Sequence, residues 1–168
     1  MGDFKVDYTP IEGGIIDLPR FAQLGSEGVL ALMSDSTNSE RQGFTPSERI
    51  VGESFERLFA KAEGKRIIIA TFSSNVHRIQ QVINCAASHG RKVAIFGRSM
   101  INVIRLAMEL GYLKVPEGVL IDIDKMQGYT DGEIVLITTG SQGEPMSALT
   151  RMALNDHRQV SITENDYI

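Results

Sequence analysis

Three short polar segments carry the side chains best suited to chemistry. They are FSSNVHR at residues 72–78, GRS at residues 97–99 and TGSQGEP at residues 139–145. Each segment follows an apolar run and precedes an amphipathic stretch, so each should join a strand to a helix. The first turn of a helix has free N–H groups and partial positive charge, which favour a bound anion and phosphate above all. The candidate phosphate-binding residues are Asn75, His77, Arg78, Arg98, Ser99, Ser141, Gln142 and Gly143.

The third segment has more small polar groups than a simple turn requires. Ser141 and Gln142 lie between two glycines, which allow the backbone to approach a ligand closely. Glu144 is unfavourable beside a phosphate, so we expect it to cap the following helix or to pair with an arginine. For any one loop, ordinary helix capping by residues such as Asn75 or Ser99 is the simpler interpretation. Three such loops on one sheet edge favour a binding site.

The elements that position these loops follow a regular alternation. Strands are predicted over residues 66–72, 92–97, 133–139 and 159–163, and helices over residues 45–64, 76–90, 100–111 and 144–154. Strand, loop and helix in repeated succession predict right-handed crossovers and a parallel sheet, which is an α/β fold. Ligands bind such sheets beyond the carboxyl ends of the strands, where the polar loops lie.

The beginning of the chain has a different pattern. Residues 1–10 predict a short strand with Phe4 and Val6 on one face, and residues 29–40 predict a second, buried strand. A loop with at most a helical turn is expected between them. This section belongs to a separate unit, with a boundary between residues 43 and 44.

Composition excludes several classes of protein. The 168 residues are 42% hydrophobic and 23% charged, with a net charge of −4, as in an ordinary globular domain. No apolar run is long enough for a membrane span and no signal peptide is visible, so we expect a cytoplasmic protein without a membrane partner. The single cysteine, Cys85, is expected to be a buried helix residue, and the three histidines are scattered, so no complete metal site is expected. Glycine-rich dinucleotide and P-loop motifs are absent.

Six separated blocks resemble one known family in order. They are GDFKVDYTP, LMSDSTNSE, FTPSERIVGES, IIATFSSNVHRIQQVI, GRKVAIFGRSM and TTGSQGEPMSAL. Together they resemble ribonuclease J, a bacterial and archaeal family of metallo-β-lactamase nucleases that carry a β-CASP domain. The resemblance implies a three-layer αβα β-CASP domain with a parallel sheet over residues 44–168. Before it, residues 1–43 would form the strand-rich end of the first metallo-β-lactamase segment.

The resemblance also implies an activity and its cofactors. Asp3 falls on the family's aspartate that bridges two catalytic metal ions, and Asp35 on an active-site acidic motif. The family hydrolyses single-stranded RNA as a 5′-to-3′ exonuclease with endonuclease activity. Two zinc ions, or manganese or magnesium, activate a water molecule there. The β-CASP domain would close one wall of the RNA channel, beside the remainder of the metallo-β-lactamase domain, in a homo-oligomer.

The family's histidine motifs are expected upstream of Met1 and beyond Ile168. The chain would then be a middle piece that binds no metal tightly and is inactive alone. One alternative is a stand-alone α/β module that binds a nucleotide or phosphorylated ligand without catalysis. Another is an assembly role, which an exposed apolar patch on the helices would indicate.

Overall fold

The computed structural model describes residues 4–11, 13–156 and 160–168, which divide into two units. The first unit extends to Val51 and the second begins at Gly52.

In the described part of the first unit, α1 (Leu18–Glu27) is a helix of 10 residues, so the expectation of a loop with at most a helical turn is wrong. The Asp17 carboxylate caps this helix by accepting a hydrogen bond from the Arg20 N–H. The described residues of this unit form no strand, so the predicted strands are wrong over residues 4–10 and 29–40. A strand forms only where another strand satisfies its backbone groups, and no segment that the structure describes pairs with these residues. Leu30 and Met33 are correspondingly exposed instead of packed on a sheet.

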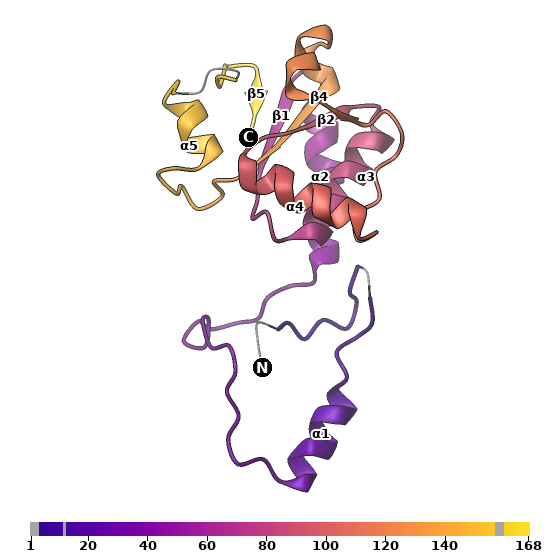
Figure 1. Ribbon diagram of the computed structural model, residues 1–168, viewed down its shortest axis with the longest axis vertical. Helices are drawn as coiled ribbons and strands as arrows, with labels where there is room; N and C mark the ends of the chain where they lie inside the picture. The colour runs from indigo at the N-terminus through magenta and orange to yellow at the C-terminus, as the bar shows by residue number, and fades with distance from the viewer. Residues whose placement is uncertain (1–3, 12, 157–159) are drawn as a thin grey trace. The chain divides into compact units, whose positions relative to one another are not determined.

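The second unit is built on a parallel sheet of five strands (Figure 1). The strands are β1 (Arg66–Ala70), β2 (Lys92–Ile95), β3 (Leu120–Ile121), β4 (Ile134–Thr138) and β5 (Asp166–Tyr167). Their spatial order is β3-β2-β4-β1-β5, with Ile67 and Val93 both opposite Val135 in the register. All five residues of β4 are buried, which explains its continuous apolar sequence.

Helices cover the sheet on both faces, as the predicted three-layer fold requires. The helices are α2 (Glu48–Lys61), α3 (Val76–Ser88), α4 (Arg98–Glu109) and α5 (Ala148–Ala153), with 3₁₀ helices η1 (Ile123–Gly128) and η2 (Asp131–Glu133). The β1-α3-β2 and β2-α4-β3 connections run one way along the sheet and β4-α5-β5 runs the other way. Right-handed crossovers therefore place α3 and α4 on one face and α5 on the opposite face. Figure 1 shows α5 across the strands from α2 and α3.

The core confirms this division of the sheet into two faces. Ile68, Ala94 and Leu136 point to one face and cluster with Ala148 and Met152 of α5. The opposite layer contributes its own fully buried residues, among them Phe59 of α2 and Ile79, Val82 and Ile83 of α3. The α/β fold with a parallel sheet, predicted from the alternation, is thus confirmed.

Several element boundaries differ from the predictions. The sequence does not predict strand β3 or helix η1. A strand of two residues and a 3₁₀ helix of six residues are too short to leave a recognisable apolar pattern. Helix α2 begins at Glu48, after Ser47, whose hydroxyl accepts a hydrogen bond from the Arg49 N–H. The predicted last strand is wrong over residues 160–163. In the described residues after α5, pairing with β1 occurs at β5.

An ion pair explains the position of β5. The Arg66 guanidinium donates to both carboxylate oxygens of Asp166, at 2.6 and 2.7 Å, and to the Ser161 carbonyl oxygen at 2.8 Å. The Asp166 side chain is 1% exposed and also accepts from the Thr163 N–H. These bonds turn the chain at Thr163 and bring β5 against β1.

None of the described helices combines the length and apolar character needed to cross a membrane.

Replacing Asp166→Ala should destabilise the second unit by about 3 kcal/mol, because it leaves a mostly buried guanidinium without its counter-charge. Urea unfolding followed by circular dichroism measures this loss. The matched control is Glu109→Ala, which removes an exposed pair with Arg105 and should cost less than about 0.5 kcal/mol. Equal losses in the two variants would contradict the anchoring role of Asp166.

Candidate functional site

The three polar loops meet at the carboxyl edge of the sheet. They follow β2, β4 and β1, which are three neighbouring strands with β4 in the middle. Hydrogen bonds continue the sheet just past the strand ends, from the Thr71 N–H to the Thr138 carbonyl and from the Phe96 N–H to the Ile137 carbonyl. The first and second loops touch directly, since the Ser73 and Ser99 hydroxyl oxygens are 3.0 Å apart.

The connections diverge at this edge. The loop after β4 leads to α5 on one face, while the loops after β1 and β2 lead to α3 and α4 on the other face. Loops that leave neighbouring strands in opposite directions open a crevice, which is where parallel α/β sheets bind ligands. The loops after both neighbours of β4, which are β2 and β1, leave toward the face opposite to the loop after β4. A crevice of this kind can therefore open on each side of β4.

The crevice between β2 and β4 is a hollow of about 450 Å³. Its polar lining comes from Arg98, Ser99, Thr139 and Arg151, with Gly97 and Met146 among its other residues. Arg151 was not predicted as a site residue. It lies on α5, half-buried, and its guanidinium contacts the Asp156 carboxylate at 3.4 Å. Two arginines from opposite layers therefore line one hollow.

The amino end of α4 is open to a ligand. Its N-cap is Gly97, with φ of 101°, so no side chain caps the helix. A Cβ atom at this position would lie 3.5 Å from the Thr139 hydroxyl, which shows how closely the second and third loops approach each other. Ser99 is not a cap, since it lies inside the helix and its hydroxyl contacts Ser73.

The amino end of α3 is capped. The Asn75 side chain accepts a hydrogen bond from the Arg78 N–H at 3.1 Å, so the capping interpretation holds for this residue. His77 is exposed and Arg78 is half-buried on the first turn of the helix. Thr71, at the start of this loop, was also missed by the sequence analysis. Its hydroxyl is buried and has no hydrogen-bond partner among the described residues, a state that a ligand or another chain segment commonly relieves.

The third loop differs from the prediction. Helix α5 starts at Ala148, with Ser147 as N-cap, and not at Glu144. Ser141, Gln142 and Gly143 lie exposed in a separate turn, closed by a hydrogen bond from the Gly143 N–H to the Gly140 carbonyl. They are therefore not at a helix N-terminus.

Glu144 has a local role in the same turn. Its carboxylate accepts a hydrogen bond from the Gln142 N–H at 3.2 Å. Among the described residues, this carboxylate contacts neither an arginine nor the first turn of α5. The expected pairing with an arginine and the expected capping of the helix are therefore not observed. The positive φ of Gly140 and Gly143, at 118° and 72°, bends the chain before a helix can start.

The two acidic candidates belong to the first unit of the chain. Asp3 lies outside the described residues, so its expected role is a prediction only. Asp35 belongs to the first unit and is exposed, and its carboxylate accepts from the Thr37 hydroxyl at 2.6 Å and from the Thr37 N–H at 3.1 Å. These hydrogen bonds hold the pKa of the Asp35 carboxyl below its ordinary value, so it is ionised at neutral pH.

Comparisons with known proteins agree on one family. The family model for the ribonuclease J beta-CASP domain matches residues 64–168. Ribonuclease J of Helicobacter pylori is 48% identical over 167 residues, which cover 99% of this chain and 24% of that protein. Ribonuclease J of Synechocystis is 46% identical with 26% of its length covered, and that of Mycolicibacterium smegmatis is 47% identical with 30% covered. The chain thus spans only about a quarter of the length of these curated relatives.

Gly140 should be the least replaceable residue of the third loop. A Cβ atom there would lie 2.5 Å from the Ser147 hydroxyl and 2.9 Å from the Leu149 Cβ, at a φ of 118°. Gly140→Ala should therefore cost about 2–4 kcal/mol of unfolding free energy. Gly143→Ala, with a φ of 72° and no atom within 4 Å, should cost about 1 kcal/mol. Chemical denaturation of the two variants tests this order, and a reversed order would contradict the loop geometry.

Proposed function

Because the chain belongs to the ribonuclease J β-CASP family, we propose that it supplies one wall of a single-stranded RNA channel in a metal-dependent ribonuclease. The observation that carries this proposal is the crevice at the carboxyl edge of the sheet, where Arg98 and Arg151 line one hollow. The relatives are named ribonucleases, and we extend RNA as the substrate from them to this chain.

Phosphate groups of the RNA backbone are the chemical feature that this edge would bind. The α4 amino end offers backbone N–H groups without a side-chain cap, together with partial positive charge. Arg98, the first residue of α4, adds a guanidinium that can donate two parallel hydrogen bonds to a phosphate. Contacts of this kind position RNA without reading its sequence.

The loops would hold successive phosphates on either side of β4. The Ser73–Ser99 contact links two of them, and the exposed Ser141–Gly143 turn lies on the third. The net charge of −4 does not oppose this, because a local cluster of cations determines attraction at short range. We propose Asn75, His77 and Arg78 as further contacts at the α3 end, in addition to the capping role of Asn75.

The described residues do not assemble a two-metal centre. Asp35 is a single carboxylate, already bonded to Thr37, and two zinc ions need several ligands each. We propose that Asp3 and Asp35 join metal ligands from the remainder of the metallo-β-lactamase domain, and that exonuclease and endonuclease activity require the complete ribonuclease.

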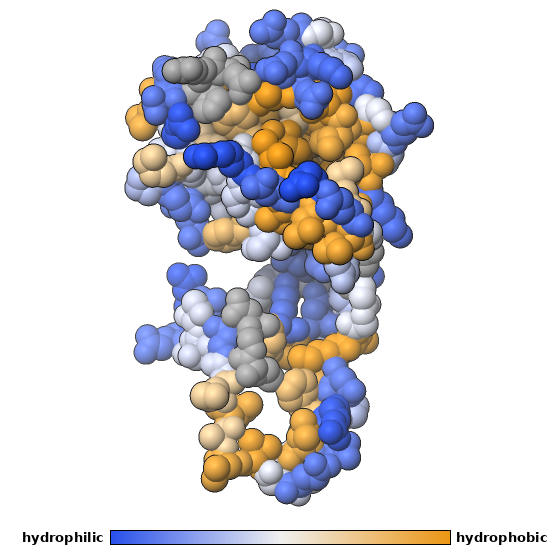
Figure 2. All heavy atoms as spheres, in the orientation of Figure 1, coloured by the Kyte–Doolittle hydropathy of each residue, from blue (hydrophilic) through white to orange (hydrophobic). Residues whose placement is uncertain are grey.

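A second surface supports the proposed partners. A hollow of about 760 Å³ beside α4 is lined largely by apolar residues, including Ile101, Ile104, Met108, Leu120 and Ile121. Figure 2 shows apolar residues gathered on this side of the second unit. Such a patch is typical of a protein–protein contact, either with the remainder of the ribonuclease or with another copy in a homo-oligomer.

The chain alone should bind single-stranded RNA weakly and with strong salt dependence. Arg98→Ala should lower the affinity about tenfold and reduce the slope of log affinity against log salt by about 0.7, because one phosphate contact is lost. Ser141→Ala should have a smaller effect, about threefold. Fluorescence anisotropy with a labelled oligonucleotide measures both. The matched control is Arg105→Ala on the same helix, where the guanidinium pairs with Glu109.

An unchanged affinity in both Arg98→Ala and Ser141→Ala would contradict the assignment of these loops. Equal affinity for a mononucleotide and a long oligonucleotide would instead favour a module for small phosphorylated ligands.

The chain alone should not hydrolyse RNA when Zn²⁺ or Mn²⁺ is added, since it lacks most ligands for two metal ions. Incubation of labelled RNA with a highly purified preparation, followed by gel electrophoresis, measures this. Cleavage that a chelator and Asp3→Ala both abolish would contradict the prediction.

A further inference from the structure

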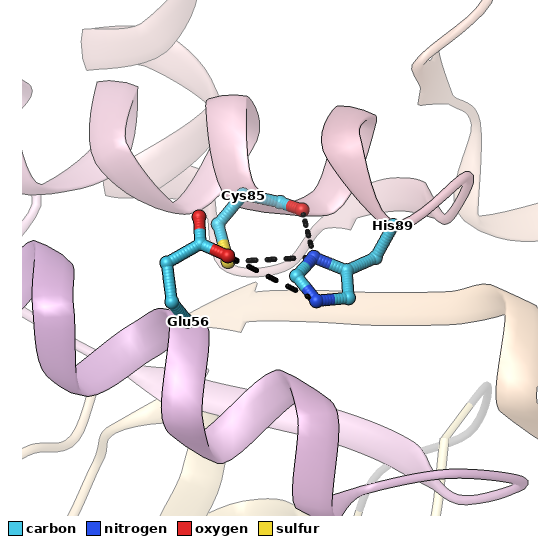
Figure 3. Close-up of side chains that lie close together, drawn as sticks. All are labelled: Glu56, Cys85 and His89. Atoms are coloured by element: carbon cyan, nitrogen blue, oxygen red, sulfur yellow. Dashed lines mark hydrogen bonds and ion pairs between the residues drawn. The ribbon is translucent and has the colours of Figure 1, made fainter.

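Three metal-ligating side chains meet where α3 ends, far along that helix from the polar loop at its start. Glu56 comes from α2, and Cys85 and His89 from the last turns of α3 and its C-cap (Figure 3). One donor atom from each of the three lies within 4.8 Å of the other two. All three belong to the second unit.

The hydrogen bonds of His89 prepare it to be a ligand. Its Nδ1 atom is 2.9 Å from the Cys85 carbonyl oxygen. A carbonyl oxygen only accepts, so Nδ1 carries the hydrogen and Nε2 is the nitrogen available to a cation. Nε2 faces the Glu56 carboxylate, with 3.9 Å between Nε2 and Oε2. Histidines that bind metals typically donate their other N–H group to a carbonyl or carboxylate in this way.

The spacing of the donors suits a tetrahedral cation. Cys85 and His89 are four residues apart, so they project from the same side of α3 toward Glu56. Zinc binds sulfur at about 2.3 Å and nitrogen or oxygen at about 2.0–2.2 Å, which places neighbouring ligand atoms roughly 3.3–3.8 Å apart. The 3.9 Å between the Glu56 and His89 atoms is close to that spacing, and Glu56 is exposed and free to adjust. The sulfur lies 3.8 Å from Nδ1 of the same ring, so a shift of the His89 side chain at the C-cap would accompany binding and bring Nε2 to the sulfur.

The same three residue types could form a nucleophilic triad, but the geometry argues against it. Cys85 is 3% exposed, so a substrate cannot reach its sulfur. Burial, with the Glu56 carboxylate adding to it, raises the pKa of the Cys85 thiol to about 12. The His89 nitrogen nearest the sulfur is Nδ1, at 3.8 Å, and its hydrogen is donated to the Cys85 carbonyl, so it cannot accept the thiol proton.

We propose that Glu56, Cys85 and His89 bind a divalent cation of the Zn²⁺ type. Binding releases the thiol proton to water, and the thiolate and carboxylate then balance the two positive charges of the cation. A water molecule would complete the tetrahedron, and of the three ligands His89 also lines a neighbouring hollow of about 330 Å³. The Arg91 guanidinium is held by the hydrogen bonds that it donates to the Ala62 and Lys65 carbonyl oxygens. The cation would join α2 to α3.

Cobalt is the probe for this site, because Co²⁺ replaces Zn²⁺ and has a visible spectrum. The reduced, metal-free chain is titrated with Co²⁺ and followed by absorbance. We expect one Co²⁺ per chain, a sulfur-to-cobalt charge-transfer band, and displacement by Zn²⁺. Cys85→Ala should abolish the band, and Glu56→Gln and His89→Gln should each weaken binding about tenfold or more. Glu53→Gln, an exposed change on the same helix, should behave as the unchanged chain.

A second measurement separates loss of the site from loss of the fold. Circular dichroism first establishes that each variant is folded, and thermal unfolding is then recorded with and without Zn²⁺. Zn²⁺ should raise the midpoint in the unchanged chain and in Glu53→Gln, but not in Cys85→Ala. The affinity of the chain for Co²⁺ or Zn²⁺ should rise about tenfold per pH unit near neutrality, because one thiol proton is released on binding.

Either of two results would overturn the proposal. One is a folded, reduced chain that gives no sulfur-to-cobalt band. The other is a Co²⁺ affinity that neither Glu56→Gln nor His89→Gln changes.

Discussion

The pairing of β4 with β1 on one side and β2 on the other is the constraint on which the second unit depends. Because β4 is buried throughout, its apolar residues must be enclosed between two helical layers. Parallel pairing in register then places the ends of β1, β2 and β4 at one edge. The loops after these strands start within a few ångströms of one another, whatever their sequences.

Given that edge, the polar residues divide between structural and functional roles. Asn75 caps α3 and Ser147 caps α5, whereas α4 begins at a glycine that has no side chain with which to cap it. The uncapped helix is also the one that carries Arg98 and faces Arg151 across the hollow. The first turn of α4 has no side-chain acceptor of its own and lies beside two arginines, so it favours binding of an external anion.

Helix α3 connects the two proposals made for this unit. Its first turn lies in the loop region proposed to contact RNA, and its end carries Cys85 and His89 beside Glu56 of α2. The two regions use different chemistry. Helix N-terminal charge and arginines suit phosphate, while a thiol, an imidazole and a carboxylate suit a thiophilic cation.

Much of the fold was determined by the sequence itself. The α/β class follows from two sequence patterns. Strands buried on both faces are continuous apolar runs, as at β1, β2 and β4, whereas helices buried on one face are amphipathic, as are the segments between these strands. Six ordered blocks identified the family, and strand–loop–helix order placed the polar loops at one edge. Residues 4–11 and 13–47 could not be predicted in this way, because apolar alternation forms a strand only where a partner strand exists.

Tertiary structure alone decided the rest. Arg151 lines the hollow because α5 crosses to the opposite face, and Glu56 meets Cys85 and His89 because α2 packs on α3. The Cys85–His89 spacing of four residues was visible in the sequence, but their partner is nearly thirty positions earlier in the chain. Arg66 likewise finds Asp166 a hundred positions away. Local sequence determines periodicity and capping, whereas contacts between distant segments depend on strand order and crossover direction, which no local pattern records.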